Sequence, residues 1–384
     1  MANCAIVGIN WGDEGKGRMV DLLASEYDVV VRYQGGNNAG HTVINQYGKF
    51  ALHLIPSGIF RPEVINLLGN GTVIDPEALL DEMQSLQAAG VSITPENFKI
   101  SDRATIVFPY HRAQDALEEE RLKGILEWKN LTIQNVYGAE PYDYDTLMAW
   151  LEKFGGQLRP YICDAGSVLR LAQLRGKNIL FEAQLGALRD IDYGIYPYTS
   201  SSTPLAAYAP IGCGAPDLRV DEVLGIVKAY STCVGEGPFT AEWFGAEADK
   251  LREAGGEYGA ATGRPRRVGP LDLVATRYGV KVQGATSIAL TKLDILSYME
   301  EIPVCIAYDI DGKKTEAFPF PSQLAKAKPV IETLPGWGCD ISGVRYWEDL
   351  PQAAQDYVTY VEDQIGCPIT YVSVGADRDA IIQR

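Results

Sequence analysis

The sequence predicts an α/β protein in which a mainly parallel central sheet carries helices on both faces, with helical and small-sheet insertions. Apolar, strand-like runs alternate with amphipathic, helix-like runs along most of the chain, and this alternation is typical of strand–helix–strand units. The first apolar run, residues 4–9, also leads directly into a glycine-rich loop and then into an amphipathic run at 18–26. Because such sheets bind ligands at the carboxyl ends of their strands, we expect the chemistry in the loops that follow strands.

Local signals place the elements in order. Asp75 is a favourable N-cap and Pro76 suits a first turn, so a helix is expected from 75 to 87. Gly255 and Gly256 close a second helix over 246–254. Further helices are expected at 220–225, 271–278 and 357–365, and strands at 28–32, 64–68, 178–182, 226–230, 287–290 and 369–374. A strand at 302–309 followed by Asp311-Gly312 predicts a hairpin. We expect one large α/β domain over 1–384, with an inserted helical lobe at about 100–175.

The loop after the first strand reads Trp11-Gly12-Asp13-Glu14-Gly15-Lys16-Gly17. Glycines let backbone N–H groups close around an anion, the next helix adds its dipole, and Lys16 can reach a terminal phosphate. The P-loop pattern needs Gly and Ser or Thr where this chain has Asn10 and Gly17. Acids in a phosphate loop need a cation or a proton-transfer role, so Asp13 is the natural magnesium ligand. We expect a P-loop-NTPase-like fold; an ordinary glycine-rich turn is the alternative.

Composition and charge exclude several classes of protein. The net charge is −16, and no basic footprint for a nucleic-acid backbone is visible. Seven cysteines form no C-x-x-C pair, which argues against zinc or a disulfide framework and favours a reducing compartment. The N-terminus lacks a signal-peptide pattern, and no apolar run approaches membrane-spanning length. We therefore expect a cytoplasmic protein that binds neither nucleic acid nor membranes.

Two basic or histidine-containing loops are candidates for anion chemistry. Residues 35–41 form an amide-rich loop that holds Asn38 and His41, and a histidine near neutral pH can act as a general acid. Residues 261–267 carry three arginines within four positions, which suit carboxylates or phosphates. For each loop taken alone, a polar surface turn is the competing interpretation.

Three polar segments later in the chain suit a nucleotide. The run 291–294 provides Lys292 and Asp294; the carboxylate can accept from guanine N1–H and N2 amino groups, while the lysine stem covers the base. Residues 373–375 could close a base pocket, and the hydroxyls of 199–203 suit a second phosphate. A polar strand end or surface loop explains each of these equally well when it is considered alone.

Together these segments resemble the adenylosuccinate synthetase family, GTP-dependent ligases that join aspartate to IMP through a C–N bond in AMP biosynthesis. The resemblance covers most of the chain, and its specificity lies in the order and spacing of the motifs. The matching segments are 11–17, 35–41, 54–58, 181–182, 190–192, 199–203, 262–267 and 291–294. It implies GTP, IMP and L-aspartate as small-molecule substrates, Mg²⁺ as cofactor, and a homodimer.

The resemblance also implies a two-step reaction. A base deprotonates IMP at N1, the 6-oxygen attacks the GTP γ-phosphate, and the aspartate amine then displaces phosphate from 6-phosphoryl-IMP. By family position, Asp13 is the base and a metal ligand, His41 the general acid, and Gly40 a further metal ligand through its carbonyl. Gln184 is a third catalytic candidate, at the 6-oxygen.

The resemblance assigns three ligand sets. The GTP set is Gly12, Gly15, Lys16, Gly17, Arg266, Lys292, Asp294, Ser373 and Gly375. The IMP set is Asp13, Lys16, Asn38, His41, Gln184, Ser200 and Arg264. The aspartate set is Ala261, Thr262, Gly263, Arg264 and Arg266.

The chain departs from the family pattern at four places. A segment of the form Gly-Ser/Thr-Thr-x-x-Gly-Ile-x-Pro is missing after Gly124; it carries a threonine for the IMP phosphate and an arginine donated across the dimer interface. We expect weaker IMP binding unless Ser200 and other groups compensate. The family's Gly-Ala-Gln-Gly is Ala183-Gln184-Leu185-Gly186 here, which moves the glutamine one place. In addition, Asn37 replaces a histidine and Pro270 a tryptophan.

Two alternatives to an active synthetase stay open. The missing segment would suit a catalytically impaired GTP-binding paralogue, although the retained Asp13, Lys16 and His41 argue against it. A relative acting on a 2-aminopurine nucleotide such as dGMP would tend to lose the acid at position 13, which this chain keeps.

Overall fold

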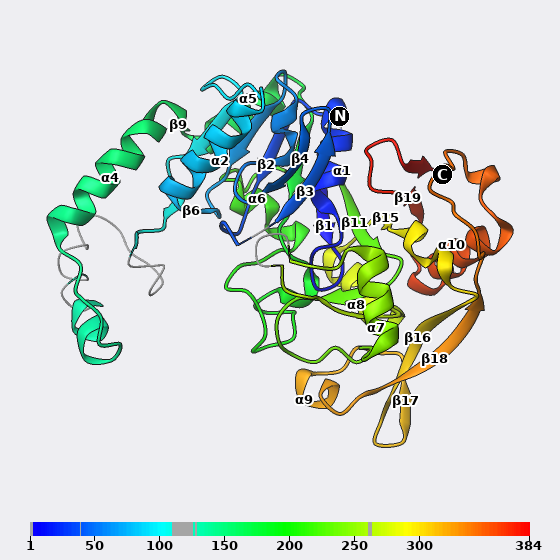
Figure 1. Cartoon of the computed structure of the whole chain (residues 1–384). Coiled ribbons are helices and arrows are strands. Elements are labelled where there is room, and N and C mark those ends of the chain that lie inside the picture. The colour runs from blue at the N-terminus through cyan, green and yellow to red at the C-terminus, as the bar shows by residue number, and fades with distance from the viewer. Residues whose placement is uncertain (1–2, 39, 110–125, 127–128, 260–262) are drawn as a thin grey trace.

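The computed structural model describes residues 3–38, 40–109, 126, 129–259 and 263–384, and its centre is a ten-stranded sheet (Figure 1). The strand order is β20-β19-β15-β11-β1-β10-β2-β5-β7-β9. Every pairing is parallel except that of β19 with β20. The strands are β1 Cys4–Gly8, β2 Val29–Arg32, β5 Ile65–Leu68, β7 Phe98–Ser101, β9 Ile162–Cys163, β10 Ile179–Glu182, β11 Glu222–Lys228, β15 Ser287–Thr291, β19 Ile369–Ser373 and β20 Ile381–Gln383. The predicted fold class is therefore confirmed.

Helices and small sheets surround this sheet. The helices are α1 Lys16–Leu23, α2 Pro76–Ala88, α4 Tyr144–Leu158, α5 Ala165–Leu174, α6 Ala209–Gly212, α7 Ala246–Gly255, α8 Leu273–Gln283, α9 Pro321–Leu324 and α10 Gln352–Ile365. The short strands outside the central sheet are β3 His41–Asn45, β4 Gly48–Leu52, β6 Val73–Ile74, β8 Thr105–Ile106, β12 Ser231–Cys233, β13 Arg267–Gly269, β14 Leu271–Asp272, β16 Glu301–Ile310, β17 Lys313–Thr315 and β18 Lys328–Pro335. They form one four-stranded and three two-stranded sheets.

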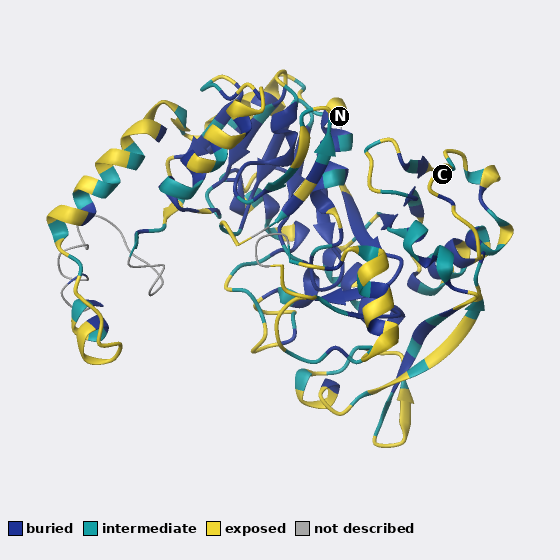
Figure 2. Cartoon of the chain, in the orientation of Figure 1, coloured by how far each residue is buried: buried dark blue, intermediate teal, exposed yellow. Residues whose placement is uncertain are grey.

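Both faces of the central sheet are buried against helices, as Figure 2 shows for its strands. In β1, Cys4 and Ile6 pack with α1, whereas Ala5 and Val7 pack with residues of α5 and α6. In β15, Ile288 and Leu290 pack with α8 and α10 on a further core cluster. Successive side chains of a strand point to opposite faces, so strands covered on both sides read as continuous apolar runs.

Local chemistry fixes several of the predicted boundaries. Asp75 caps α2 by accepting from the backbone N–H of Ala78 at 3.2 Å, and Gly256 ends α7 with φ 59°, a left-handed conformation that glycine adopts without cost. The hairpin of β16 and β17 turns at Asp311 and Gly312, with φ 53° and 81°. Positive φ at both central residues is the type I′ geometry that a two-residue hairpin favours.

One prediction about the central sheet was wrong. Residues 220–225, expected to be helical, lead into strand β11 and form its first half. This strand pairs with β1 on one side and β15 on the other, and a short apolar run buried in this way cannot be told from a buried helix by periodicity. Two helix boundaries also moved: α10 begins at Gln352 rather than 357, and α8 runs over Leu273–Gln283 rather than 271–278, with residues 271–272 in strand β14. A further strand, β20, follows the strand that begins at 369.

The segment from 100 to 175 includes both sheet elements and a projecting helix. Strand β9 and helix α5 belong to the main body, whereas α4 projects from the β9 edge of the sheet (Figure 1). Only Leu147 and Leu158 of α4 are buried. That the whole chain is one domain stays a prediction. Among the described residues, none of the helices has the length and apolar character needed to span a membrane.

Candidate active site

The loop between β1 and α1 has the backbone of an anion-binding turn. Gly12, Asp13 and Gly15 have positive φ values of 103°, 60° and 99°. Glycine adopts this region freely, and aspartate tolerates it better than most side chains. The loop therefore curls back on itself before α1 begins at Lys16.

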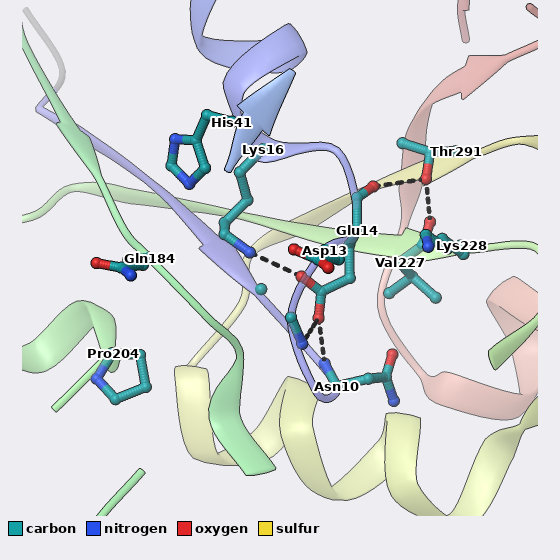
Figure 3. Close-up of polar contacts among 12 residues, drawn as sticks. Asn10, Asp13, Glu14, Lys16, His41, Gln184, Pro204, Val227, Lys228 and Thr291 are labelled. Atoms are coloured by element: carbon teal, nitrogen blue, oxygen red, sulfur yellow. Dashed lines mark hydrogen bonds and ion pairs between the residues drawn. The ribbon is translucent and has the colours of Figure 1, made fainter. Parts of the chain in front are cut away.

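The carboxylate of Glu14 occupies the inside of this loop (Figure 3). Its Oε1 accepts from the backbone N–H groups of Asn10 at 3.1 Å and Gly12 at 2.8 Å. Its Oε2 lies 2.7 Å from Lys16 Nζ, and both side chains are buried. Backbone donors and a lysine thus already converge on one anionic group. This is the arrangement that the sequence predicted for a phosphate, although it assigned no such contact to Glu14.

A buried carboxylate orients His41. The Nδ1 atom of His41 lies 2.5 Å from Glu182 Oε1, and Glu182 also accepts from the hydroxyl and the backbone N–H of Ser57 at 2.6 and 2.8 Å. Burial alone would raise the pKa of Glu182, but His41 and Ser57 lower it. Because an ionised carboxylate only accepts, Nδ1 carries the proton that binds it, and Nε2 is left for a ligand.

His41 also lies against the phosphate loop. A Cβ added to Gly17 would come within 2.7 Å of His41 Cβ, so the absence of a side chain at Gly17 lets the two segments meet. Figure 3 shows the imidazole beside Lys16. The structure therefore brings together two sequence-predicted loops, 11–17 and 35–41. Glu182, which orients the histidine, was noted in the sequence only as part of a matching segment.

Gln184 reaches the candidate site although the glutamine has moved along the motif. Its Oε1 accepts from buried Arg32 at 2.6 Å, and its Nε2 donates to Asn38 Oδ1 at 2.8 Å. A Cβ on Gly35 would collide with this carboxamide. The following residue, Leu185, occupies the family glutamine's place with φ 63°, a conformation that costs a bulky residue free energy. Gln184 and Asn38, both predicted to contact IMP, are therefore joined.

Asp13 forms an ion pair with the arginine loop at 261–267. Its Oδ2 lies 2.9 Å from a terminal nitrogen of Arg266, and one third of the Asp13 side chain is exposed. Burial alone would lower the pKa of Arg266, but Asp13 and Glu257 raise it. The predicted base thus faces the site while an arginine fixes its direction.

The predicted guanine residues also gather at the carboxyl edge of the sheet. Lys292 follows β15, and Asp294 has a buried Oδ1 for which the described residues offer no hydrogen-bond partner. Burial raises the pKa of Asp294. An unpaired buried acceptor of this kind is costly and marks a place for a donor.

Arg18 is the contact here that sequence reasoning missed. It donates from α1 to Ser373 Oγ at 2.5 Å and to the Gly375 carbonyl at 2.6 Å. The loop at 373–375 is therefore tied to the helix that follows the phosphate loop.

Further predicted residues belong to the hydroxyl loop at 199–203 and to the arginine loop. Ser200 Oγ lies 2.8 Å from Ser202 Oγ, and Ser202 donates to Gln34, whose Nε2 donates to the Gln184 carbonyl at 2.7 Å. The hydroxyl loop is thereby linked to Gln184. Gly263 and Arg264 are exposed. Ala261 and Thr262, predicted for aspartate, lie outside the described residues.

Comparison with known proteins gives this site a family. The family model described as adenylosuccinate synthetase matches residues 5–124 and 119–382. The chain belongs to the adenylosuccinate synthetase family. The adenylosuccinate synthetase of Caldanaerobacter subterraneus is 43% identical over 423 aligned positions, covering 100% of this chain and 99% of that one. That of Halothermothrix orenii is 44% identical over 425 positions, with the same coverage.

Two solved structures share this fold. A fully ligated adenylosuccinate synthetase from Plasmodium falciparum matches with a TM-score of 0.90 and 30% identity over 100% of both chains. The succinoaminodeoxyadenylate synthetase of cyanophage S-2L, solved with dGMP and dATP, covers 100% of this chain and 95% of its own at a TM-score of 0.62. Its identity is 19%, so this second likeness shows the fold alone.

The comparisons also bear on the missing family segment. The alignment with the Caldanaerobacter synthetase spans 423 positions although this chain has 384 residues, so that synthetase has residues without a counterpart here. The two stretches matched by the family model meet at residues 119–124, in agreement with the predicted break after Gly124. Gly124 itself lies outside the described residues.

The residues at the loop suit a magnesium ion that is held together with nucleotide phosphates. Among the residues that the structure describes, no three His, Cys, Asp or Glu side chains come together as a metal site. Mg²⁺ is usually held by one or two carboxylates together with substrate phosphates and water. The partly exposed Asp13 carboxylate, at a loop built for phosphate, fits that pattern.

Proposed function

We propose that the chain joins IMP and L-aspartate at the expense of GTP, and that adenylosuccinate, GDP and phosphate are the products. One observation carries the proposal: Lys16, Asp13 and the oriented His41 meet at one loop. This meeting places a cation, a candidate base and a candidate acid at one glycine-rich loop, which is what phosphoryl transfer between two nucleotides needs.

The first step forms 6-phosphoryl-IMP. Asp13 takes the proton from IMP N1, and the electron pair moves to the 6-oxygen, which attacks the γ-phosphorus of GTP. The bond from that phosphorus to the β–γ bridging oxygen breaks, and GDP leaves. Lys16 stabilises the phosphates, while His41 donates from Nε2 to the phosphoryl group as its charge shifts.

The second step uses the activated carbon. The aspartate amine attacks C6 and gives up one proton as the C–N bond forms. The bond from C6 to oxygen breaks, and phosphate departs with the oxygen that IMP supplied. Arginines suit the two aspartate carboxylates because their planar donors can bind a carboxylate with two hydrogen bonds. We assign this role to Arg264 and Arg266, with Thr262 and its neighbours Ala261 and Gly263. Gln184 and Asn38 would fix the purine, and Ser200 its phosphate.

The GTP contacts complete the proposal. Asp294 would accept from guanine N1–H and N2, with Lys292, Ser373 and Gly375 around the base. The phosphates would be held by Gly12, Gly15, Lys16, Gly17 and Arg266. Asp13 and the Gly40 carbonyl would hold Mg²⁺, which, when bound, neutralises charge on the phosphates.

The proposal includes a homodimer and a cytoplasmic location. All seven cysteines are free in the structure, which suits a reducing compartment. The homodimer is what membership of the family implies. Light scattering on the purified chain would show its mass in solution.

A phosphate-release assay tests the activity. With GTP, IMP and aspartate together we expect one phosphate for each adenylosuccinate formed, and none when any substrate is left out. Intact GTP binding without turnover would favour the impaired paralogue. Replacing IMP by dGMP should give no product; product from dGMP would favour the 2-aminopurine alternative.

A further inference from the structure

A buried cluster of charged side chains surrounds Glu257 and reaches the candidate site through Arg266. Glu257 follows Gly256, the C-cap of α7, and its side chain is fully buried. Lys228 Nζ lies 2.9 and 3.0 Å from its two oxygens, and Lys292 Nζ lies 2.7 Å from Oε1. Arg266 lies 2.8 Å from Oε2, and the Tyr230 hydroxyl donates to Oε1 at 2.6 Å. One carboxylate therefore pairs with three cations and accepts a hydrogen bond from a phenol.

The charges of this cluster make the carboxylate essential to it. Burial alone would raise the pKa of Glu257, but Lys228 and Lys292 lower it far below its usual range. Burial lowers the pKa of Lys228 to about 8, against the attraction of Glu257. Without the negative charge, the three neighbouring cations would repel one another, and Lys228 would be left as a buried charge without its anionic partner.

Two of the three cations lead into different parts of the proposed site. Arg266 bridges from Glu257 to the candidate base Asp13, with 2.9 Å to the latter. Lys292 has φ 60° and begins the turn that carries Asp294. Lys228 ends strand β11 and donates to Thr232 at 2.9 Å, so it anchors the cluster to the sheet.

We propose that Glu257 is a positioning residue for two cations at once. It holds Lys292 in place beside the proposed guanine site, and it holds Arg266 in place beside Asp13 and the proposed aspartate site. The inference rests on the proposed function. Glu257 itself is buried and touches no proposed substrate position; it acts through the two cations. Losing its charge should therefore weaken both subsites at once, although they lie on separate segments of the chain.

The test substitutes Glu257→Gln, which keeps the shape and removes the charge. We expect the Kd for GTP and the KM for aspartate each to rise roughly 10- to 100-fold, the worth of a hydrogen bond between charged groups. The KM for IMP should change by less than about threefold. A general loss of fold would instead raise all three constants together. Glu247→Gln, on the exposed face of α7, is the matched control and should behave like the wild type. An unchanged GTP Kd and aspartate KM would overturn the inference.

A double-mutant cycle separates positioning from a structural effect. In a Lys292→Met background, Glu257→Gln should raise the GTP Kd by a smaller factor than it does in the wild type, because the contribution through Lys292 is gone and only that through Arg266 remains. If the two effects multiply instead, Glu257 does not act through Lys292 and the inference fails. The cycle measures only GTP binding, so it can be carried out even if the wild type has no turnover. GTP binding without turnover would contradict the proposed function, and the cycle would still test the role of Glu257. A wild type that binds no GTP overturns both.

A compensated variant covers the case in which Glu257→Gln does not fold. Replacing Lys228→Met together with Glu257→Gln removes one buried positive charge with the negative one. We expect this double variant to fold and to keep the GTP and aspartate defects. Wild-type GTP and aspartate constants in the folded double variant would overturn the inference, as would recovery of either constant alone.

Discussion

Asp13 combines an uncommon backbone conformation with a charged partner. Its φ is 60° and its carboxylate pairs with Arg266. Asp13→Asn keeps a residue that tolerates this conformation but removes the basic oxygen and the charge, so turnover should be abolished. Phosphate release measures this, with the unfolding midpoint as a check on the fold. Substantial turnover in Asp13→Asn or Asp13→Ala would show that another group is the base.

His41 depends on Glu182 for its orientation. His41→Asn should lower kcat roughly 10²- to 10⁴-fold, because a positioned general acid is lost. Glu182→Gln keeps the imidazole but frees its tautomer, so it should also lower kcat, with a smaller effect on the KM for GTP. Steady-state kinetics of both variants test this pair. A change confined to KM would mean that the histidine binds substrate and does not act in the chemical step.

At the residue scale, the sequence could predict the motif residues but not their buried partners. Gly15, Lys16 and His41 belong to segments with recognisable local patterns. Glu182 and Arg32 are single charged residues at the ends of apolar strands, and they bond to His41 across 141 positions and to Gln184 across 152. A local pattern carries no information about such distant pairs.

A clamp between two elements connects the phosphate loop with the proposed guanine loop. From α1, Arg18 binds carbonyls and a hydroxyl of residues 373–380. Arg18→Met should raise the Kd for GTP roughly tenfold, since a hydrogen bond from a charged donor is worth about 1.5–3 kcal/mol. Hydrogen exchange should become faster in residues 374–380. The control is Arg61→Met, which removes contacts to the far end of α1; equal effects in both variants would contradict a clamp specific to this loop.

Elements were predictable where a cap or turn marks them, as at Asp75, Gly256 and Asp311. The helix wrongly placed at 220–225 had no such mark, and its outcome depended on pairing with β1 and β15, which the local sequence does not encode. The expectation that the chemistry lies in the loops after strands needs no such mark. In the structure, the loop after β1 contacts His41, which follows β2 along the chain, and Thr291 at the end of β15.

For the whole molecule, the lowered pKa of Glu257 predicts how stability depends on pH. The ordinary pKa of the carboxyl is 4.5 and the folded value lies below it, so its contribution is fully present above pH 4.5. Below that pH the unfolded chain takes up the proton first, and the contribution falls by about 1.4 kcal/mol per pH unit. The difference in unfolding free energy between wild type and Glu257→Gln should stay constant from pH 7 to about 5 and shrink below 4.5. Urea denaturation across this range tests the sign; a difference that grows on acidification would contradict it.

The resemblance assigns a threonine and a partner-subunit arginine for the IMP phosphate to the missing segment, so its loss would affect the molecule as a whole. The KM for IMP should be higher than that of the Caldanaerobacter synthetase measured under the same conditions, while the GTP constants should be similar. Ser200→Ala should raise the KM for IMP further if its loop compensates. Equal IMP constants in the two proteins would show that other groups replace the segment fully.

The central claim is that the IMP 6-oxygen, and not water, attacks the γ-phosphate of GTP, and a label follows that oxygen directly. IMP carrying a heavy oxygen isotope at the 6-position should yield inorganic phosphate that contains the label, with one labelled phosphate for each adenylosuccinate. Unlabelled phosphate would mean that water attacks GTP and that the chain is a nucleotide hydrolase, which would contradict the account.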